Sequence, residues 1–279
     1  MKILVTGSRG QLGRALARVA AERGDTFVGY DLPELDITDV AAARAAVADA
    51  QPDAIINCAA FTAVDAAESE EAKALAINGT AVRHLAAAAD EIGAVLVQIS
   101  TDYVFDGASQ RPYREDDAVS PRSAYGRTKL AGEEAARAAR RHLIVRTAWL
   151  FGEGHNFVDA IRTQVENGVT SLRVVSDQRG CPTYAVDLAG TILRLLTAGA
   201  LGVVHAVNAG STTWFEFARE IVRRLGSSAE VVPISTAEAS RPAPRPPCSL
   251  LDTSELRRIL GSDLPPWQDA LERYLASGS

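Results

Sequence analysis

Short apolar runs alternate with longer amphipathic segments through the first half of the chain. Each run has the length of a buried strand, and the segments between the runs repeat apolar side chains at helical spacing, as Leu12, Leu16 and Val19 do. Strands that alternate with helices predict βαβ units, a parallel sheet and helices on both of its faces. We predict strands over 2–6, 26–30, 54–57, 94–99 and 142–146, and helices over 11–23, 40–50, 71–91 and 123–141.

After about residue 150 the pattern loosens. A Pro-rich segment at 241–247 excludes a helix and favours extended backbone. Apolar pairs flank this segment, at 231–232 and 250–251, so we predict a loop docked on the protein rather than a linker. Helices are predicted over 156–167, 185–196, 215–225, 252–260 and 267–275, and a strand over 203–207.

Composition narrows the class of protein. The chain has 279 residues, 47% of them hydrophobic and 23% charged, which allows a globular core without disulfides or metals. A net charge of −6 argues against a nucleic-acid partner. Three scattered cysteines without a CxxC fit a reducing cytoplasm. No signal peptide and no uninterrupted apolar stretch long enough for a membrane helix are visible, so we expect a cytoplasmic protein.

A glycine motif follows the first predicted strand. Gly7, Gly10 and Gly13 form a G-x-x-G-x-x-G pattern that leads into the first predicted helix. Glycines there let the backbone approach a pyrophosphate, and the helix N-terminus supplies N–H donors and a positive dipole. The motif and its position predict a dinucleotide site.

The end of the second predicted strand bears on cofactor choice. Asp31 stands at the distance expected for a carboxylate that contacts the ribose 2′-OH, which favours NADH. Arg9 and Arg14 lie close enough in the sequence to accept the 2′-phosphate of NADPH. The alternatives are a helix cap and solvated arginines, so both cofactors remain open. Asp36 and Ile37 would flank the adenine in such a fold, or form an acidic turn.

Two further strand ends carry candidate chemistry. Small residues at 57–62, including Ala59, leave room for a cofactor beside the third strand. Thr101 ends the fourth strand, and Tyr125 and Lys129 lie four positions apart on one helical face. A tyrosine with an adjacent ammonium suits carbonyl reduction, because the charge is expected to lower the phenol pKa, while a threonine hydroxyl can bond the substrate oxygen.

These motifs, in this order, resemble those of the extended short-chain dehydrogenase/reductase superfamily. Segments 59–68, 100–107, 125–133, 146–152 and 176–183 are more closely similar to the dTDP-4-dehydrorhamnose reductase family, and the Ser-Thr-Asp-Tyr-Val-Phe sequence from Ser100 is specific to that branch. The resemblance implies a Rossmann-type doubly wound domain over 1–150, to which segments at about 180–210 return. It also implies a smaller C-terminal α/β domain over 151–279, mainly for substrate.

The resemblance further implies a reaction and its residues. The reaction is reduction of the C4 ketone of dTDP-4-dehydro-L-rhamnose by NADPH or NADH. Thr101, Tyr125 and Lys129 fall on catalytic positions, and the last two also contact the cofactor. The other expected cofactor contacts are Gln11, Leu12, Asp31, Asp36, Ile37, Ala60, Phe61 and Thr62, beside the glycines and Ala59; the expected substrate contacts are Thr101, Asp102, Tyr125, Trp149, Asn156, Arg241 and Arg245. Core packing for Trp149 and solvent exposure for the two arginines are the alternatives.

Some members of this family are dimers bridged by Mg²⁺ through acidic side chains, one of them on the first helix. Here the first acidic residue of that helix is Glu22, at its far end, while Arg14 and Arg18 would repel a cation. We therefore expect no metal site, no requirement for Mg²⁺, and a monomer or a metal-independent homodimer. The four histidines show no ligand spacing.

Two other functions remain open. A nucleotide-sugar 4,6-dehydratase needs an Asp-Glu pair after the active-site threonine, but Tyr103 follows Asp102. A non-catalytic NADP-binding protein, similar to the regulatory subunit of methionine adenosyltransferase, would bind cofactor without oxidising it. Oxidation of NAD(P)H by a 4-keto-6-deoxy sugar nucleotide separates a reductase from both.

Overall fold

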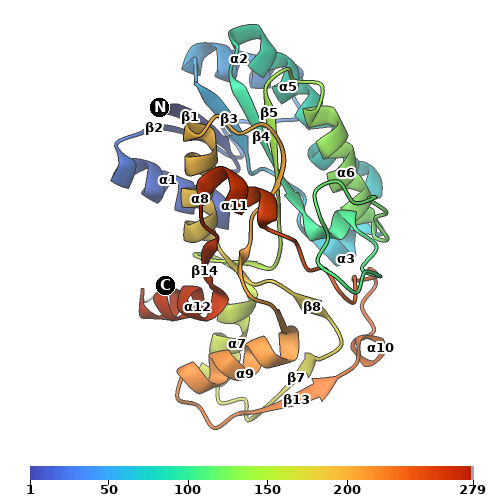
Figure 1. Cartoon of the computed structure of the whole chain (residues 1–279). Helices are drawn as coiled ribbons and strands as arrows, with labels where there is room; N and C mark the ends of the chain where they lie inside the picture. The colour runs from blue at the N-terminus through green and yellow to red at the C-terminus, as the bar shows by residue number, and fades with distance from the viewer. Residues whose placement is uncertain (278–279) are drawn as a thin grey trace.

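The computed structural model describes residues 1–277, and its centre is a six-stranded parallel sheet (Figure 1). The four inner strands are short apolar runs with little or no exposure on either face, as is typical of a parallel sheet covered by helices, whereas the edge strand at 26–30 is partly exposed. In spatial order the strands are β2 (Thr26–Tyr30), β1 (Lys2–Thr6), β3 (Ala54–Asn57), β4 (Val95–Thr101), β5 (His142–Thr147) and β10 (Gly202–His205).

Helices cover both faces of this sheet, so the predicted doubly wound fold is confirmed. On one face, Leu16 and Leu188 belong to a buried cluster with the strands, and on the other face Val47 and Leu85 do the same. The first face carries α1 (Gln11–Arg23), α8 (Ala185–Thr197) and α11 (Ser254–Leu260); the second carries α2 (Val40–Ala50), α5 (Ala81–Ile92) and α6 (Ala124–Ala136).

The sheet order creates a crevice beside β1. After β1 the chain adds β2 on one side, and it then crosses to β3 on the other side. Loops that follow β1 and β3 therefore diverge at the carboxyl edge of the sheet, which is where open α/β sheets bind their ligands.

A second layer of structure lies below the sheet in Figure 1. Its core is aromatic and includes Phe151, Phe217, Trp267 and Tyr274. The surrounding elements are α7 (Phe157–Glu166), α9 (Trp214–Arg224), α12 (Trp267–Ala276) and a parallel pair of strands, β7 (Ser171–Val175) and β13 (Glu230–Ile234).

Short elements complete the chain. They lie in the connections between the larger elements, and several of the short strands pair into two-stranded sheets. They are α3 (Val64–Ala67), α4 (Glu71–Leu75), η1 (Ala76–Thr80), η2 (Asp102–Val104), β6 (Leu150–Phe151), β8 (Arg179–Gly180), β9 (Thr183–Tyr184), β11 (Asn208–Ala209), β12 (Thr212–Thr213), α10 (Thr236–Ala239) and β14 (Leu264–Pro266).

Three expectations from the sequence need correction. The single helix predicted over 71–91 is wrong in detail, because the π-helical turn η1 separates α4 from α5. The helix predicted over 123–141 ends at Ala136. Strands β7 and β13 were not predicted at all.

Two other expectations concern the second half. The docked Pro-rich loop is confirmed, since Ala243 is buried and its N–H donates to Asp65. The segment 185–205 returns to the sheet as α8 and β10, while the domain boundary near residue 150 stays a prediction. Over residues 1–277, no helix is both long and apolar enough to span a membrane.

Candidate functional site

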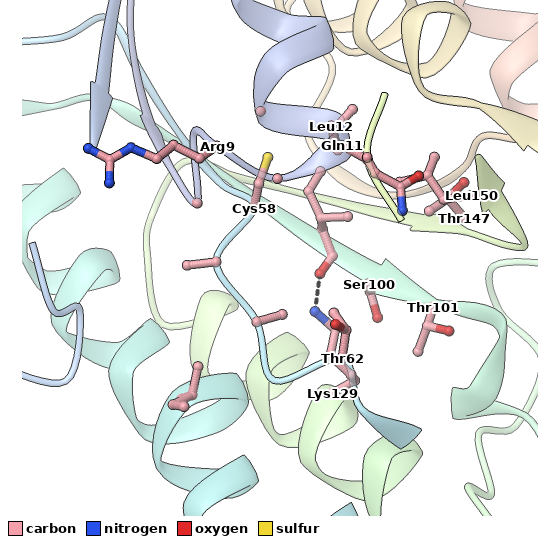
Figure 2. A pocket seen from close by; sticks show the side chains of 18 of the residues that line it. Arg9, Gln11, Leu12, Cys58, Thr62, Ser100, Thr101, Lys129, Thr147 and Leu150 are labelled. Carbon is pink, nitrogen blue, oxygen red and sulfur yellow. Dashed lines mark hydrogen bonds between the residues drawn. The ribbon is translucent and has the colours of Figure 1, made fainter. Parts of the chain in front are cut away.

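A cavity of about 910 Å³ opens at the carboxyl edge of the sheet. Its walls come from the loops after β1, β3, β4 and β5, from the start of α6, and from the second layer. Figure 2 shows Ser100, Thr101 and Lys129 on one side of this cavity and Arg9 pointing away on the other. The cavity thus runs from the glycine motif to the predicted catalytic residues.

The glycine motif forms a tight cradle between β1 and α1. Gly7 has a φ of +66°, and a Cβ there would lie 2.6 Å from the backbone nitrogen of Ala59. A Cβ on Gly13 would lie 2.4 Å from the carbonyl oxygen of Gly7. No side chain caps the N-terminus of α1 at Gly10. The exposed end of the helix can therefore bind an anion through its own N–H groups.

Three polar atoms on the cavity wall have no hydrogen-bond partner among the described residues. They are Oε1 of Gln11, Oδ2 of Asp102 and Oγ1 of Thr147, all buried. The amide nitrogen of Gln11 donates to the carbonyl of His155 at 2.8 Å, which fixes the direction of Oε1. Buried polar groups usually find a hydrogen-bond partner, so these atoms fit a polar ligand that fills the cavity. Together with the glycine cradle they match what a dinucleotide requires.

Charged side chains at the adenosine end pair with one another. Asp31 accepts hydrogen bonds from the N–H groups of Arg9, at 2.8 Å, and Leu32, at 2.9 Å. The guanidinium of Arg9 pairs with Glu34 and that of Arg14 with Glu153. Asp31, Arg9 and Arg14 all line the cavity, whereas Glu34 does not. The structure therefore brings the candidates for 2′-OH recognition and for 2′-phosphate recognition to one place.

Most of the predicted site residues line this cavity. In addition to the residues already placed there, it is lined by Gly10, Leu12, Asp36, Ile37, Ala59, Ala60, Thr62, Thr101, Asp102, Tyr125, Lys129 and Trp149. The sequence therefore identified a single site, although the roles assigned to individual residues stay predictions.

Four predicted contacts do not line the cavity. Phe61 donates its N–H to Asn78 instead, and the buried Asn156 caps α7. Arg245 makes a bidentate ion pair with Asp65, at 2.8 and 3.0 Å, and Arg241 lies 3.7 Å from the same carboxylate. Their predicted contacts with cofactor or substrate would require a change in these interactions.

The predicted catalytic residues meet where β4 ends against α6. The Thr101 hydroxyl donates to Oδ1 of Asp102 at 2.9 Å. The Lys129 ammonium donates to the carbonyl of Ile99 at 2.6 Å, the bond dashed in Figure 2. Burial lowers the pKa of Lys129 to about 8 and raises that of Asp102 to about 6, although Ser249 and Thr101 stabilise the Asp102 carboxylate by hydrogen bonding.

The expected depression of the Tyr125 pKa is wrong. Burial and the nearby Asp102 carboxylate raise the pKa of Tyr125 well above its ordinary value, and a hydrogen bond with Thr101 offsets this only in part. The Lys129 ammonium is directed at the Ile99 carbonyl. Tyr125 is therefore a neutral phenol that holds its proton at neutral pH.

Two residues in and around the site were missed in the sequence. Trp214, at the start of α9, stacks on Trp149 with ring centroids 3.6 Å apart and an interplanar angle of 8°. Trp149 has a φ of +45°, an unusual conformation for a large side chain. Such backbone strain is concentrated at functional sites. Nothing in the sequence near 214 signals this contact, because it depends on two distant segments.

The second missed residue is Asn78, in the π-helical turn. Its side chain accepts from the N–H of Phe61 at 2.8 Å and donates to the Thr128 hydroxyl at 3.1 Å. It therefore ties the 59–62 wall of the cavity to α6, between Tyr125 and Lys129. Single π-helical turns are often found at functional sites, and an asparagine inside a predicted Ala-rich helix is a weak signal of one.

The structure gives no candidate metal centre in its described part. Over residues 1–277, no group of three or more His, Cys, Asp or Glu side chains is arranged to hold a metal ion. On α1, Arg18 pairs with Glu22 at 3.0 Å. Independence of Mg²⁺ stays a prediction, because it concerns behaviour in solution.

Comparisons with known proteins agree on one family. The family model described as the RmlD substrate binding domain matches residues 1–279. A dTDP-4-dehydrorhamnose reductase of Streptomyces griseus is 47% identical over 278 residues, which cover 96% of this chain and 91% of that protein. A probable dTDP-4,6-dihydroxy-2-methyloxan-3-one 4-ketoreductase of Streptomyces antibioticus is 43% identical, covering 97% and 93%.

A solved structure extends the agreement to three dimensions. A dTDP-4-dehydrorhamnose reductase of Bacillus anthracis, crystallised in complex with NADP, superposes with a TM-score of 0.96 at 36% identity. The match covers 99% of each chain. Both layers of the fold are therefore shared with that protein.

Proposed function

The chain belongs to the RmlD substrate binding domain family, and we propose that it reduces the C4 ketone of dTDP-4-dehydro-L-rhamnose to dTDP-L-rhamnose with NADPH or NADH. One observation carries the proposal. A single cavity combines a glycine cradle, polar atoms without protein partners, and Thr101, Tyr125 and Lys129 at its far end.

The residues present fit a nicotinamide dinucleotide. The loop from Gly7 to Gly13 and the N-terminus of α1 would hold the pyrophosphate. Asp31 would accept from the adenosine ribose, and Lys129 would hold the nicotinamide ribose. When bound, the cofactor supplies a hydride to the ketone carbon.

The protein supplies the proton and the orientation. Tyr125, which is a neutral phenol, donates its proton to the ketone oxygen as that oxygen gains negative charge. The Thr101 hydroxyl, once turned from Asp102 toward the substrate, would stabilise the same oxygen by a hydrogen bond. Lys129, cationic below about pH 8, stabilises the tyrosinate that remains until it regains a proton.

The test is a coupled assay. Purified upstream enzymes generate the keto sugar in situ, and oxidation of NADPH and of NADH is followed by absorbance. We expect turnover with both cofactors and dTDP-L-rhamnose as the product. Binding of cofactor without oxidation would contradict a reductase and favour the non-catalytic alternative.

A second substrate is suggested by the similarity to the probable ketoreductase of Streptomyces antibioticus. Its substrate is also a dTDP-linked 4-ketone by name, so the same residues would serve either sugar. A direct comparison of kcat/KM for dTDP-4-dehydro-L-rhamnose and for the dTDP-linked 4,6-dihydroxy-2-methyloxan-3-one, a 2,6-dideoxy 4-ketone, distinguishes the two. Preference for the 2,6-dideoxy sugar would move the assignment to that branch.

We also propose a cytoplasmic enzyme that works as a monomer or a metal-independent homodimer. The three free cysteines suit a reducing compartment, and Arg14 and Arg18 disfavour a cation on α1. Light scattering should give the same molar mass, and the assay the same turnover rate, with and without EDTA. A lower mass together with lost turnover on chelation would show that acidic residues elsewhere bind the metal.

A further inference from the structure

Behind the catalytic residues lies a carboxylate with no access to solvent. Glu133 follows Tyr125 and Lys129 at the same four-residue spacing on α6, so all three lie on one face of the helix. The Glu133 side chain is 0% exposed and that of Arg146 is 1% exposed. A charge this deeply buried must be matched by hydrogen bonds and an opposite charge.

The partners of Glu133 come from two adjacent strands. Arg146 of β5 donates to both carboxylate oxygens at 2.8 Å. Ser100 of β4 donates to Oε1 at 2.5 Å. Ser100 and Arg146 are neighbours in the β4–β5 register. One carboxylate thus joins α6 to the carboxyl ends of both strands.

These bonds adjoin the residues assigned to the reduction. Ile99, Ser100 and Thr101 are consecutive at the end of β4: the first accepts from Lys129, the second donates to Glu133, and the third would bond the ketone oxygen. Two successive bonds therefore fix the strand against the helix just before Thr101. A small displacement of Thr101 from the ketone oxygen would therefore remove much of the rate enhancement that Thr101 provides.

We propose that Glu133 is a positioning residue: its carboxylate fixes the end of β4 against α6 and so sets where Thr101 and Lys129 lie relative to Tyr125. This inference rests on the proposed function, because it assigns Glu133 a part in that same reduction. Glu133 itself touches neither cofactor nor substrate, since it is absent from the cavity wall.

The charge of Glu133 also acts on Lys129. Burial lowers the pKa of Lys129 to about 8, and the Glu133 carboxylate opposes this effect. Arg146, and Arg137 at 3.7 Å, are the cations that face Glu133. Neutralising Glu133 would remove its support for the ammonium, so Lys129 would lose its proton at a lower pH.

The experiment compares Glu133→Gln with Glu134→Gln, a matched change at the exposed next position of the same helix. Rates with keto sugar and NADPH are measured as a function of pH. For Glu133→Gln we expect kcat to fall about tenfold or more, KM for NADPH to change less than about threefold, and the alkaline loss of activity to begin at lower pH. The Glu134→Gln variant should match the wild type.

A second readout does not need turnover. The chain has only three lysines, Lys2, Lys73 and Lys129, so nitrogen NMR of ¹⁵Nζ-labelled lysine can follow each titration. In Glu133→Gln the Lys129 titration should move to lower pH by about half a unit or more. If wild type fails to turn over but this shift is seen, the proposed reaction is wrong and the positioning contact stands.

Unchanged kcat and an unshifted Lys129 titration, with only a lower melting temperature, would overturn the proposal and leave Glu133 a purely structural residue. Glu133→Gln leaves Arg146 unpaired and can fail to fold. In that case Ser100→Ala, which keeps the ion pair, decides. A fall in kcat of about threefold or more, with the melting temperature retained, supports the proposal, and an unchanged kcat overturns it.

Discussion

The ion pairs next to the two ends of the cavity differ in how far solvent reaches them. At the adenosine end, the side chains of Arg9 and Glu34 are 59% and 49% exposed. At the catalytic end, Glu133 and Arg146 are 0% and 1% exposed, and Lys129 is 3% exposed. Solvent screens the first pair, whereas nothing screens the second.

This difference predicts where the protein tolerates change. An exposed pair such as Arg9–Glu34 can exchange partners at little cost, so the adenosine end can adapt to either cofactor. The buried groups have fixed partners, and losing one leaves another unsatisfied. Substitutions should therefore have large effects at the catalytic end and small effects at the adenosine end.

The largest effect is expected from Tyr125→Phe. It removes the proton donor but keeps the edge-on ring contact with Tyr103, whose centroid is 5.5 Å away. We expect kcat to fall about 100-fold or more, with the dissociation constant for NADPH near that of the wild type. Tyr103→Phe, another cavity tyrosine, is the matched control and should stay within a few-fold of wild type. Turnover of Tyr125→Phe within a few-fold of wild type would remove Tyr125 from this role.

The second effect is on stability and depends on pH. Burial raises the pKa of Asp102 from 3.8 to about 6, so its contribution to stability is present below about pH 4 and is lost as pH rises through about 6. Relative to Asp102→Asn, the free energy of unfolding of the wild type should therefore fall by about 3 kcal/mol between these limits. Denaturant titrations of both proteins measure this, and parallel pH profiles would refute it.

A smaller effect is expected where the two layers meet. Trp149→Ala removes the ring that stacks on Trp214 and lines the cavity. We expect the affinity for the sugar nucleotide to weaken about tenfold while NADPH affinity changes less than about twofold. Calorimetry with each ligand tests this. An equal loss of both affinities together with a lower melting temperature would indicate a packing role alone.

The smallest effects are expected at the adenosine end. NADPH and NADH should differ by less than about 100-fold in kcat/KM, because Asp31 favours one cofactor while Arg9 and Arg14 favour the other. Glu34→Gln frees Arg9 and should shift the ratio toward NADPH by less than about fivefold. Glu91→Gln breaks an exposed pair with Arg44 away from the cavity and serves as the control. A larger ratio of kcat/KM between the two cofactors in the wild type would show that either Asp31 or the two arginines dominate cofactor choice.

The same contrast between local and distant contacts explains what the sequence could predict. Strand β1, helix α1 and the glycine turn between them have local signals, and their predicted bounds match the structure. Tyr125 and Lys129 are four residues apart, so their shared face was visible. The strands β7 and β13 lacked such signals, since Ser171 and Glu230 pair across a long separation and Pro233, a residue unusual in strands, lies within the second strand.

Partners of charged residues were the hardest part to predict. Arg245 was expected to contact the substrate, but in this structure it pairs with Asp65, 180 positions away. The burial of Tyr125 could not be predicted from the sequence either. Its spacing from Lys129 suggested a lowered phenol pKa, whereas burial in the folded site raises that pKa. Glu133 lay on the predicted helical face, yet its role depends on Ser100 and Arg146, which only the folded sheet brings to it.

Transfer of deuterium from the cofactor to the sugar is the decisive test of the proposed reduction. NADPH that carries deuterium at its transferable position is incubated with the enzyme and dTDP-4-dehydro-L-rhamnose, and the product is examined by NMR. We expect dTDP-L-rhamnose with deuterium at C4 and loss of the label from the cofactor. Oxidation of the cofactor without label at C4, or no oxidation at all, would contradict it.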